Sequence, residues 1–158
     1  MTVFDHIGVV VDDSAVAALL SPRSIYVANI VAHFAAQGRP VVTTACALAV
    51  ATVTEQLAER DLETLVGAGV TVLDLTALGA LETGKLAARS ELRSLAKAHT
   101  THVALSLGGW TILTNSPESY QETGLGLGHR HVLSRPAAGE ADRDGAYCRR
   151  HAGDGRDL

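Results

Sequence analysis

The chain has 158 residues, of which 47% are hydrophobic and 19% charged, and its formal net charge is −4. This length and balance predict one globular domain and exclude a largely disordered chain. The acidic charge argues against a dedicated binder of duplex DNA, which needs basic residues for phosphate contacts, and the 4% aromatic content argues against a base-stacking platform.

The first clear element is a strand over Ile7–Val11. Its short, almost wholly apolar and β-branched run is typical of a strand that is covered on both faces, as in a parallel sheet. The strand ends at Asp12, and either Asp13 or Ser14 can cap the helix that follows. A buried strand and its helix therefore open the chain, with carboxylates between them.

Helices and further strands alternate along the chain to about residue 120. The predicted helices are Ala15–Leu20, Pro22–Gln37, Ala45–Leu57, Leu62–Gly67, Thr76–Ala88 and Ser90–Gly108, the last with a break allowed near His99–Thr101. The other clear strands are Val70–Leu75 and Trp110–Thr114. This alternation favours βαβ units, and we predict a three-layer α/β/α sandwich around a central, mostly parallel sheet.

The composition changes after about Gly124. The segment His129–Leu133 is consistent with one last edge strand, and the residues from Ser134 onward show almost no apolar periodicity. We therefore expect a domain over residues 1–133 and a polar, flexible tail over residues 134–158.

A cytoplasmic location is the expectation from the sequence. No run reaches the roughly 18 consecutive apolar residues of a membrane span, and the stretch from Met1 to Asp5 lacks the basic region of a signal peptide. Of the two cysteines, Cys46 lies in an apolar helical run and resembles a small core residue. We therefore expect a reducing compartment and no membrane partner.

A binding site is expected where the parallel strands end, because ligands of open α/β sheets bind outside the carboxyl ends of the strands. In this chain those ends carry Asp12, Asp74 and the run Thr114-Asn115-Ser116. Asp74 can also be a solvated or capping carboxylate.

Several segments resemble a known family. They are the strand ending in Asp12, the Ala-rich helix after Pro40-Val41-Val42, and the runs Ala80–Ala88 (ALETGKLAA), Thr100–Leu105 (TTHVAL) and Trp110–Pro117 (WTILTNSP). In this order and spacing, residues 5–133 resemble PIN-domain proteins, including the VapC-type toxins of bacterial toxin–antitoxin pairs. The resemblance implies a ribonuclease that holds Mg²⁺ or Mn²⁺ by carboxylates, which activates water and offsets charge at the scissile phosphate.

The resemblance also implies four acidic positions. They are an Asp after the first strand, a Glu in the buried helix, an Asp at the start of the helix before the last core strand, and often an Asp after that strand. In this chain they map to Asp12, Val50, Thr100 (or His99 in a shifted register) and Ser116. Only Asp12 is acidic, so the metal motif is degenerate and we expect no resident cofactor.

Two nearby acids do not replace the missing ones easily. Asp13 is adjacent to Asp12, and neighbours at a strand end point in different directions. Glu55 lies five residues after Val50, which is about 500° around a helix, so we expect it to point elsewhere.

Three functions remain open. The first is a non-catalytic PIN-like protein that acts through protein contacts or weak nucleic-acid binding. The second is a Mg²⁺- or Mn²⁺-dependent ribonuclease, a VapC-like toxin that acts on RNA with rearranged ligands from Asp12, Asp74 and His99 or His102, the two histidines being one helical turn apart. The third is a structural homodimer or larger homo-oligomer that assembles through the apolar helix face of Ile25–Phe34.

Overall fold

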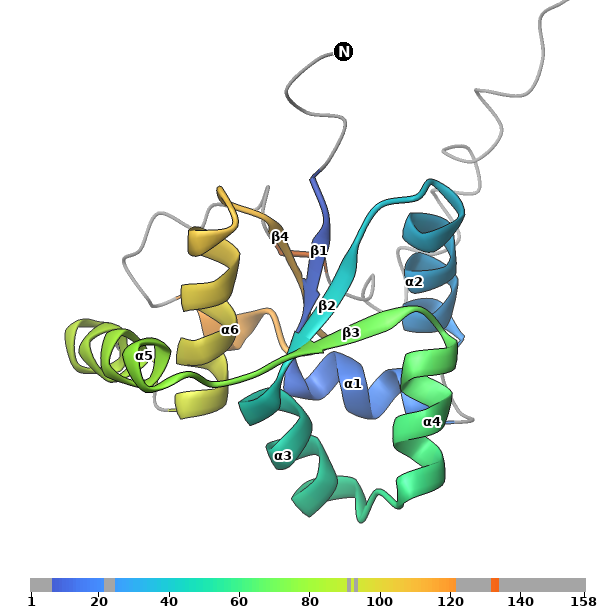
Figure 1. Ribbon diagram of the computed structural model, residues 1–158, viewed down its shortest axis with the longest axis horizontal. Helices are drawn as coiled ribbons and strands as arrows, with labels where there is room; N and C mark the ends of the chain where they lie inside the picture. Colours follow the sequence, from blue (N-terminus) through green and yellow to red (C-terminus); the bar gives the residue numbers. More distant parts are fainter. Residues whose placement is uncertain (1–6, 22–24, 91, 93, 122–131, 134–158) are drawn as a thin grey trace, which may run out of the picture.

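The computed structural model describes residues 7–21, 25–90, 92, 94–121 and 132–133 (Figure 1). The predicted helix start at Pro22 and the predicted tail over 134–158 lie outside these ranges. Among the helices described, none is long and apolar enough to cross a membrane.

The elements alternate between strands and helices, as the sequence predicts. In chain order they are β1 (Val9–Val11), α1 (Asp13–Leu20), α2 (Tyr26–Ala36), β2 (Val41–Thr44), α3 (Ala45–Glu55), α4 (Glu59–Gly67), β3 (Val70–Leu73), α5 (Ala77–Arg89), α6 (Leu95–Ser106), β4 (Thr111–Leu113), α7 (Glu118–Gln121) and β5 (Val132–Leu133).

The strands form one parallel sheet in the order β3-β2-β1-β4-β5. β1 lies in the middle, and β5 confirms the edge strand expected near residue 133. Strand β2 was not predicted, since Thr43 and Thr44 have the character of helix caps. Thr44 is both the last residue of β2 and the N-cap of α3. Its hydroxyl accepts a hydrogen bond from the Ala47 amide.

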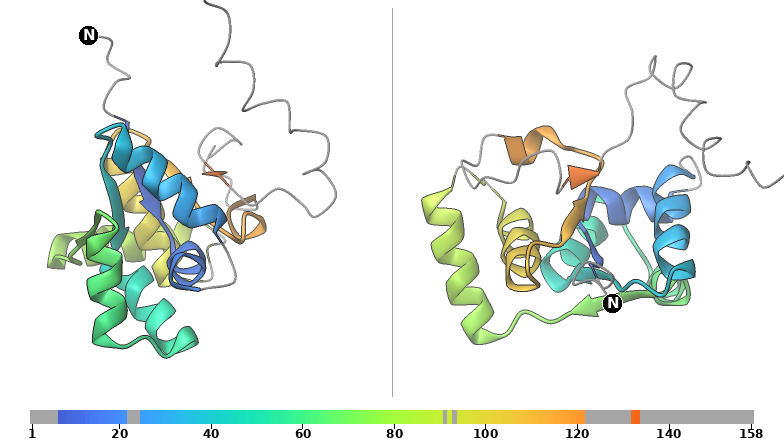
Figure 2. Two further views of the ribbon diagram at one scale, coloured as in Figure 1. Left: turned by 90° about the vertical axis from the view of Figure 1, so that its right-hand side faces the viewer. Right: turned by 90° about the horizontal axis from the view of Figure 1, so that it is seen from above.

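Helices cover both faces of the sheet, which confirms the three-layer sandwich (Figures 1 and 2). Side chains alternate between the two faces along a strand. Val9 and Val11 therefore point to one face of the sheet and Val10 to the other. On the first face the strands pack with buried residues of α1, α2, α3 and α4, and on the second with α6 and α7. This burial on both faces explains the continuous apolar run of β1.

The apolar face of α2 belongs to the protein's own core. Val27, Val31 and Phe34 are buried against the sheet, and Ile25, which precedes the helix, is 74% exposed. These three residues are therefore not available to a second copy, and the homodimer that the sequence suggested through Ile25–Phe34 stays a prediction.

Two helix boundaries differ from the prediction. α6 begins at Leu95 rather than Ser90 and runs without a break through His99–Thr101. The N-cap of α1 is Asp12, whose carboxylate accepts a hydrogen bond from the Ala15 amide, rather than Asp13 or Ser14. Both differences change which side chains meet at the carboxyl end of β1.

Candidate functional site

The site is built around Asp12, the residue that joins β1 to α1. Its backbone still belongs to the sheet, since the Asp12 amide donates to the Leu113 carbonyl at 3.1 Å. Its carbonyl accepts from the Val16 amide at 2.8 Å in the first turn of α1. The side chain is completely buried, so the fold places a carboxylate at the centre of the sheet's carboxyl edge.

Five donors surround the Asp12 carboxylate. Oδ1 accepts hydrogen bonds from the Ser14 hydroxyl at 2.8 Å and the Ala15 amide at 2.9 Å. Oδ2 accepts from Lys97 Nζ at 2.9 Å, the Thr114 hydroxyl at 2.6 Å and the Tyr120 hydroxyl at 3.1 Å. A carboxylate offers about four lone-pair sites, so these donors use its whole accepting capacity.

Lys97 supplies the positive charge of the site. It lies in the first turn of α6, and its ammonium also forms an ion pair with Asp13 Oδ1 at 3.1 Å. Burial alone lowers the pKa of Lys97, but the charges of Asp12 and Asp13 and the hydrogen bonds to them outweigh burial and raise that pKa above its ordinary value. The lysine is therefore a fixed cation in the folded protein.

Tyr120, on α7, packs on the same face of the sheet as α6 and completes the site. Its ring lies under the ammonium, with Lys97 Nζ 5.1 Å from the ring centroid, within the range of a cation–π contact. Burial, and then the charge of Asp12, raise the pKa of the Tyr120 phenol well above its ordinary value. The phenol therefore keeps its proton and remains a donor to Asp12.

The other positions that the resemblance singles out do not surround Asp12 with acids. Val50 lies on α3 and is 38% exposed, and Thr100 is fully buried in α6. Ser116 follows β4, where its amide donates to the Thr114 hydroxyl at 3.0 Å. Because α6 begins at Leu95, the residue in its first turn that reaches Asp12 is Lys97, one turn before Thr100.

The alternative ligand set is not brought together. Asp74 follows β3 and is exposed, and β3 is separated from β1 by β2, a distance of about 9–10 Å at ordinary strand spacing. His99 is buried, and that burial, with the neighbouring charge of His102, lowers its pKa. Within the described ranges, no group of three or more His, Cys, Asp or Glu side chains is placed to hold a metal ion.

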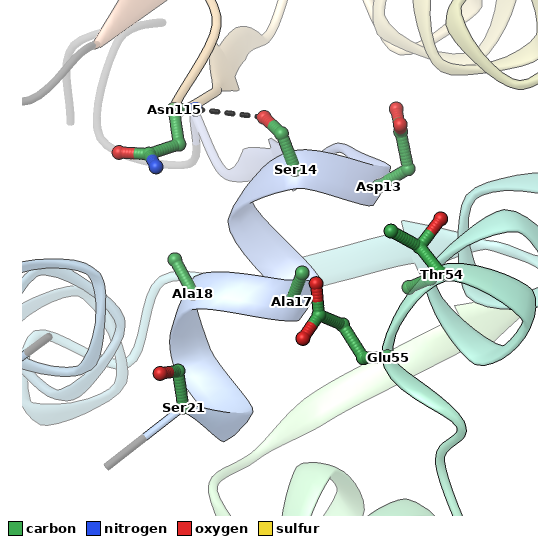
Figure 3. Close-up of a pocket in the computed structure, with 9 residues that line it drawn as sticks. Asp13, Ser14, Ala17, Ala18, Ser21, Thr54, Glu55 and Asn115 are labelled. Atoms are coloured by element: carbon green, nitrogen blue, oxygen red, sulfur yellow. Dashed lines mark hydrogen bonds between the residues drawn. The ribbon is translucent and has the colours of Figure 1, made fainter. Parts of the chain in front are cut away.

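A cavity of about 380 Å³ opens beside the site, between α1 and α3 (Figure 3). Asp13 and Glu55 contribute carboxylates to it from the two helices, and its remaining lining residues are Ser14, Ala17, Ala18, Ser21, Ala51, Thr54 and Asn115. Glu55 was expected to point away from the position of Val50, yet it shares this cavity with Asp13. The cavity therefore has acidic walls, while Asp12 itself is buried outside it.

A divalent cation does not fit the Asp12 site as it is built. Mg²⁺ and Mn²⁺ bind through oxygen lone pairs, and those of Asp12 already accept five hydrogen bonds. A metal ion would also have to approach the Lys97 ammonium, which is held between the oxygens of Asp12 and Asp13. The ammonium of Lys97 therefore offsets one of the two carboxylate charges at the carboxyl end of β1.

Sequence reasoning missed Lys97 and Tyr120 as members of the site. Each is separated from Asp12 by more than 80 residues, at 85 and 108 positions. The one available signal was the charge of Lys97 inside the otherwise uncharged run Leu95–Ser106, since a buried lysine is rare unless it is paired.

No known family model matches the chain, and neither does any curated protein. Among solved structures, the chain is similar to one in the crystal structure of DNA-bound VapBC from Salmonella typhimurium, with a TM-score of 0.54 and 17% sequence identity. The match covers 75% of this chain and 93% of that chain. The likeness supports a PIN-like fold for this chain.

Proposed function

We propose that this chain is a non-catalytic PIN-like protein that acts through contacts with a protein partner. The observation that carries the proposal is the state of Asp12, the only acidic residue among the four mapped positions. The protein's own donors occupy the lone pairs of this carboxylate. A nuclease of this type needs free carboxylate oxygens, because the metal must bind both protein and phosphate.

The missing carboxylates support the same conclusion. Metal-dependent phosphodiester hydrolysis uses one or two ions to activate water and stabilise the leaving oxygen. Val50 and Thr100 contribute no metal-binding carboxylate, and Ser116 contributes only a hydroxyl. Asp13 is held by Lys97, and Asp74 is exposed two strands away from Asp12. We therefore propose no metal cofactor for the unmodified chain.

A protein partner is proposed on two grounds. The similar solved structure is of a complex, VapBC, and this chain exposes several large apolar side chains. Those more than half exposed are Ile25, Val53, Val66, Leu78, Leu81 and Leu95. Of these, Leu78 and Leu81 lie one turn apart on α5 and share a helix face, and we propose this face for contact with the partner. The net charge of −4 makes RNA a weak ligand at most.

A ribonuclease assay tests the proposal. The purified chain is incubated with end-labelled single-stranded RNA and an excess of Mg²⁺ or Mn²⁺, beside Asp12→Asn protein prepared in parallel. We expect no cleavage above the buffer control. If the unmodified chain cleaves the RNA and the Asp12→Asn protein does not, the chain is an enzyme and the proposal is refuted. Equal cleavage in both samples identifies a contaminating nuclease and leaves the chain inactive.

A further inference from the structure

The ammonium of Lys97 lies where a bridging cation would lie between two carboxylates. Its Nζ is 2.9 Å from Asp12 Oδ2 and 3.1 Å from Asp13 Oδ1. We infer that Lys97 replaces a metal ion in this fold: its side chain neutralises the acidic centre from within and prevents a divalent cation from binding there. This inference deepens the proposed function and rests on it.

The surroundings of the ammonium favour a substitute for a cation over an incidental surface ion pair. The Lys97 side chain is 11% exposed, and the Asp12 side chain is not exposed at all. An ammonium has three N–H donors, and two of them point to carboxylates while the nitrogen also faces the Tyr120 ring. A buried lysine so fully engaged is held in place and is not exchanged with solvent ions.

The position of Lys97 in the chain supports the same inference. The resemblance to PIN-domain proteins implies a carboxylate at the start of the helix before the last core strand, a position that maps to Thr100 or, in a shifted register, to His99. In this chain that helix, α6, begins at Leu95. Lys97 lies in the first turn of α6, one turn before Thr100, and it is the residue of this turn that reaches Asp12. It brings a positive charge and no ligand oxygen to the carboxyl end of β1.

The charges of the two arrangements are equal. Asp12 and Asp13 with the Lys97 ammonium carry a net charge of −1. With an aspartate at position 97, three carboxylates and one divalent cation would also carry −1. Lys97→Asp therefore restores a metal-binding centre without changing the charge that the surrounding fold has to accommodate once the ion is bound.

Binding of Mn²⁺ measures the inference directly. Free Mn²⁺ is titrated by electron paramagnetic resonance in the unmodified chain, in Lys97→Asp and in Lys85→Asp. Lys85 is a matched control, because it is an exposed lysine whose ammonium pairs with Glu82 at 2.7 Å on α5. We expect Lys97→Asp to bind one Mn²⁺ at least about tenfold more tightly than either other protein, since Mn²⁺ takes carboxylate ligands.

Thermal unfolding gives a second measurement on the same samples. Mn²⁺ should raise the melting temperature of Lys97→Asp and leave that of the unmodified chain unchanged, because a ligand stabilises only a folded state that binds it. If Lys97→Asp is unfolded without metal, recovery of its circular dichroism on addition of Mn²⁺ supports the inference. If it stays unfolded, Lys97→Ala takes its place, and tighter Mn²⁺ binding than in the unmodified chain is then required.

Two results overturn the inference. One is equal Mn²⁺ affinity in the unmodified chain and in the folded position-97 variants, and the other is binding in Lys85→Asp that matches Lys97→Asp. Either result leaves the proposed function standing if the unmodified chain cleaves no RNA. Cleavage by the unmodified chain that Asp12→Asn abolishes, in contrast, refutes the proposed function whatever the position-97 variants bind, so the two failures are distinguishable.

Discussion

Asp12 serves the fold at the scale of a single residue. It hydrogen-bonds within the sheet, caps α1 and anchors an ammonium from α6. The carboxylate that the sequence marks as the first metal ligand therefore has structural contacts of its own in this chain. Under the proposed function these contacts are its role, because removing it would leave a buried lysine short of its main partner.

Replacing Asp12 with asparagine tests this structural role. Asparagine keeps the size of the side chain but loses its charge. Its NH₂ group is a donor, and it would face the donors that now surround the carboxylate. Breaking a buried ion pair costs about 3–5 kcal/mol, and we expect about 3 kcal/mol here because Asp13 still pairs with Lys97. Urea unfolding at neutral pH measures the loss. The control is Asp74→Asn, at an exposed carboxylate, which should change the stability by no more than about 0.5 kcal/mol. Equal losses of stability in the two variants would contradict the structural role of Asp12.

The sequence predicted Asp12 well because its signal is local. An apolar strand that ends in an aspartate and a helix shows both the position and the burial of that residue within a few neighbours. Lys97 and Tyr120 have no such signal, since their roles depend on contacts across 85 and 108 residues. Helical periodicity shows which face of an element is apolar, but it does not show which residue of another element lies opposite.

At the scale of the element, short strands and helix ends were the difficult parts. β2 has only four residues, and two of them are threonines that cap helices as readily as they extend strands. The helix before β4 was predicted to start five residues early, at Ser90 instead of Leu95. The helix start matters at the site, because it places Lys97 in the first turn of α6, one turn before Thr100.

Helix α5 should be the least protected long helix of the described fold. It packs mainly against α6 and lies outside the sheet layers (Figure 1). Its one buried residue is Thr83, whereas α6 buries seven. Local opening takes less free energy where few apolar contacts are lost. Hydrogen exchange followed by mass spectrometry should show α5 amides exchanging at least about tenfold faster than those of α6, a difference of ~1.4 kcal/mol.

The Thr83 hydroxyl offers a control for this difference. It is buried, and no hydrogen-bond partner for it lies within the described residues. Thr83→Val keeps the shape and removes the unpaired polar group, which should stabilise the docking of α5 by about 1 kcal/mol and slow its exchange. Thr64→Val, at an exposed threonine on α4, should leave exchange in α5 unchanged. Equal protection of α5 and α6 in the unmodified chain would contradict the prediction.

At the scale of the whole molecule, the Asp12 cluster joins parts of the chain that fold far apart in sequence. Its donors come from α1, from the end of β4, from α6 and from α7. The cluster can form only when the sheet and both helical layers are in place. Two of its members, Lys97 and Tyr120, hold protons more tightly in the folded chain than in the unfolded one, since the pKa of each is raised.

This proton binding makes the whole protein sensitive to alkali. Unfolded tyrosine and lysine lose their protons near pH 10. Above that pH the folded chain binds more protons than the unfolded chain, so stability falls as the pH rises. The contribution of both groups is fully present below about pH 10 and is lost as the pH rises through their raised pKa values, at up to about 1.4 kcal/mol per pH unit for each group.

Urea unfolding between neutral pH and about pH 11 measures this slope, and Tyr120→Phe separates the two groups. The phenylalanine keeps the ring under the Lys97 ammonium and removes the phenol, so the slope should become shallower while the lysine contribution remains. Tyr26→Phe is the matched control, because burial raises the pKa of partly buried Tyr26 as well, but less than that of Tyr120. It should reduce the slope less. A slope in Tyr120→Phe equal to that of the unmodified chain would mean that the phenol ionises equally in both states, and that its hydrogen bond to Asp12 does not hold the proton.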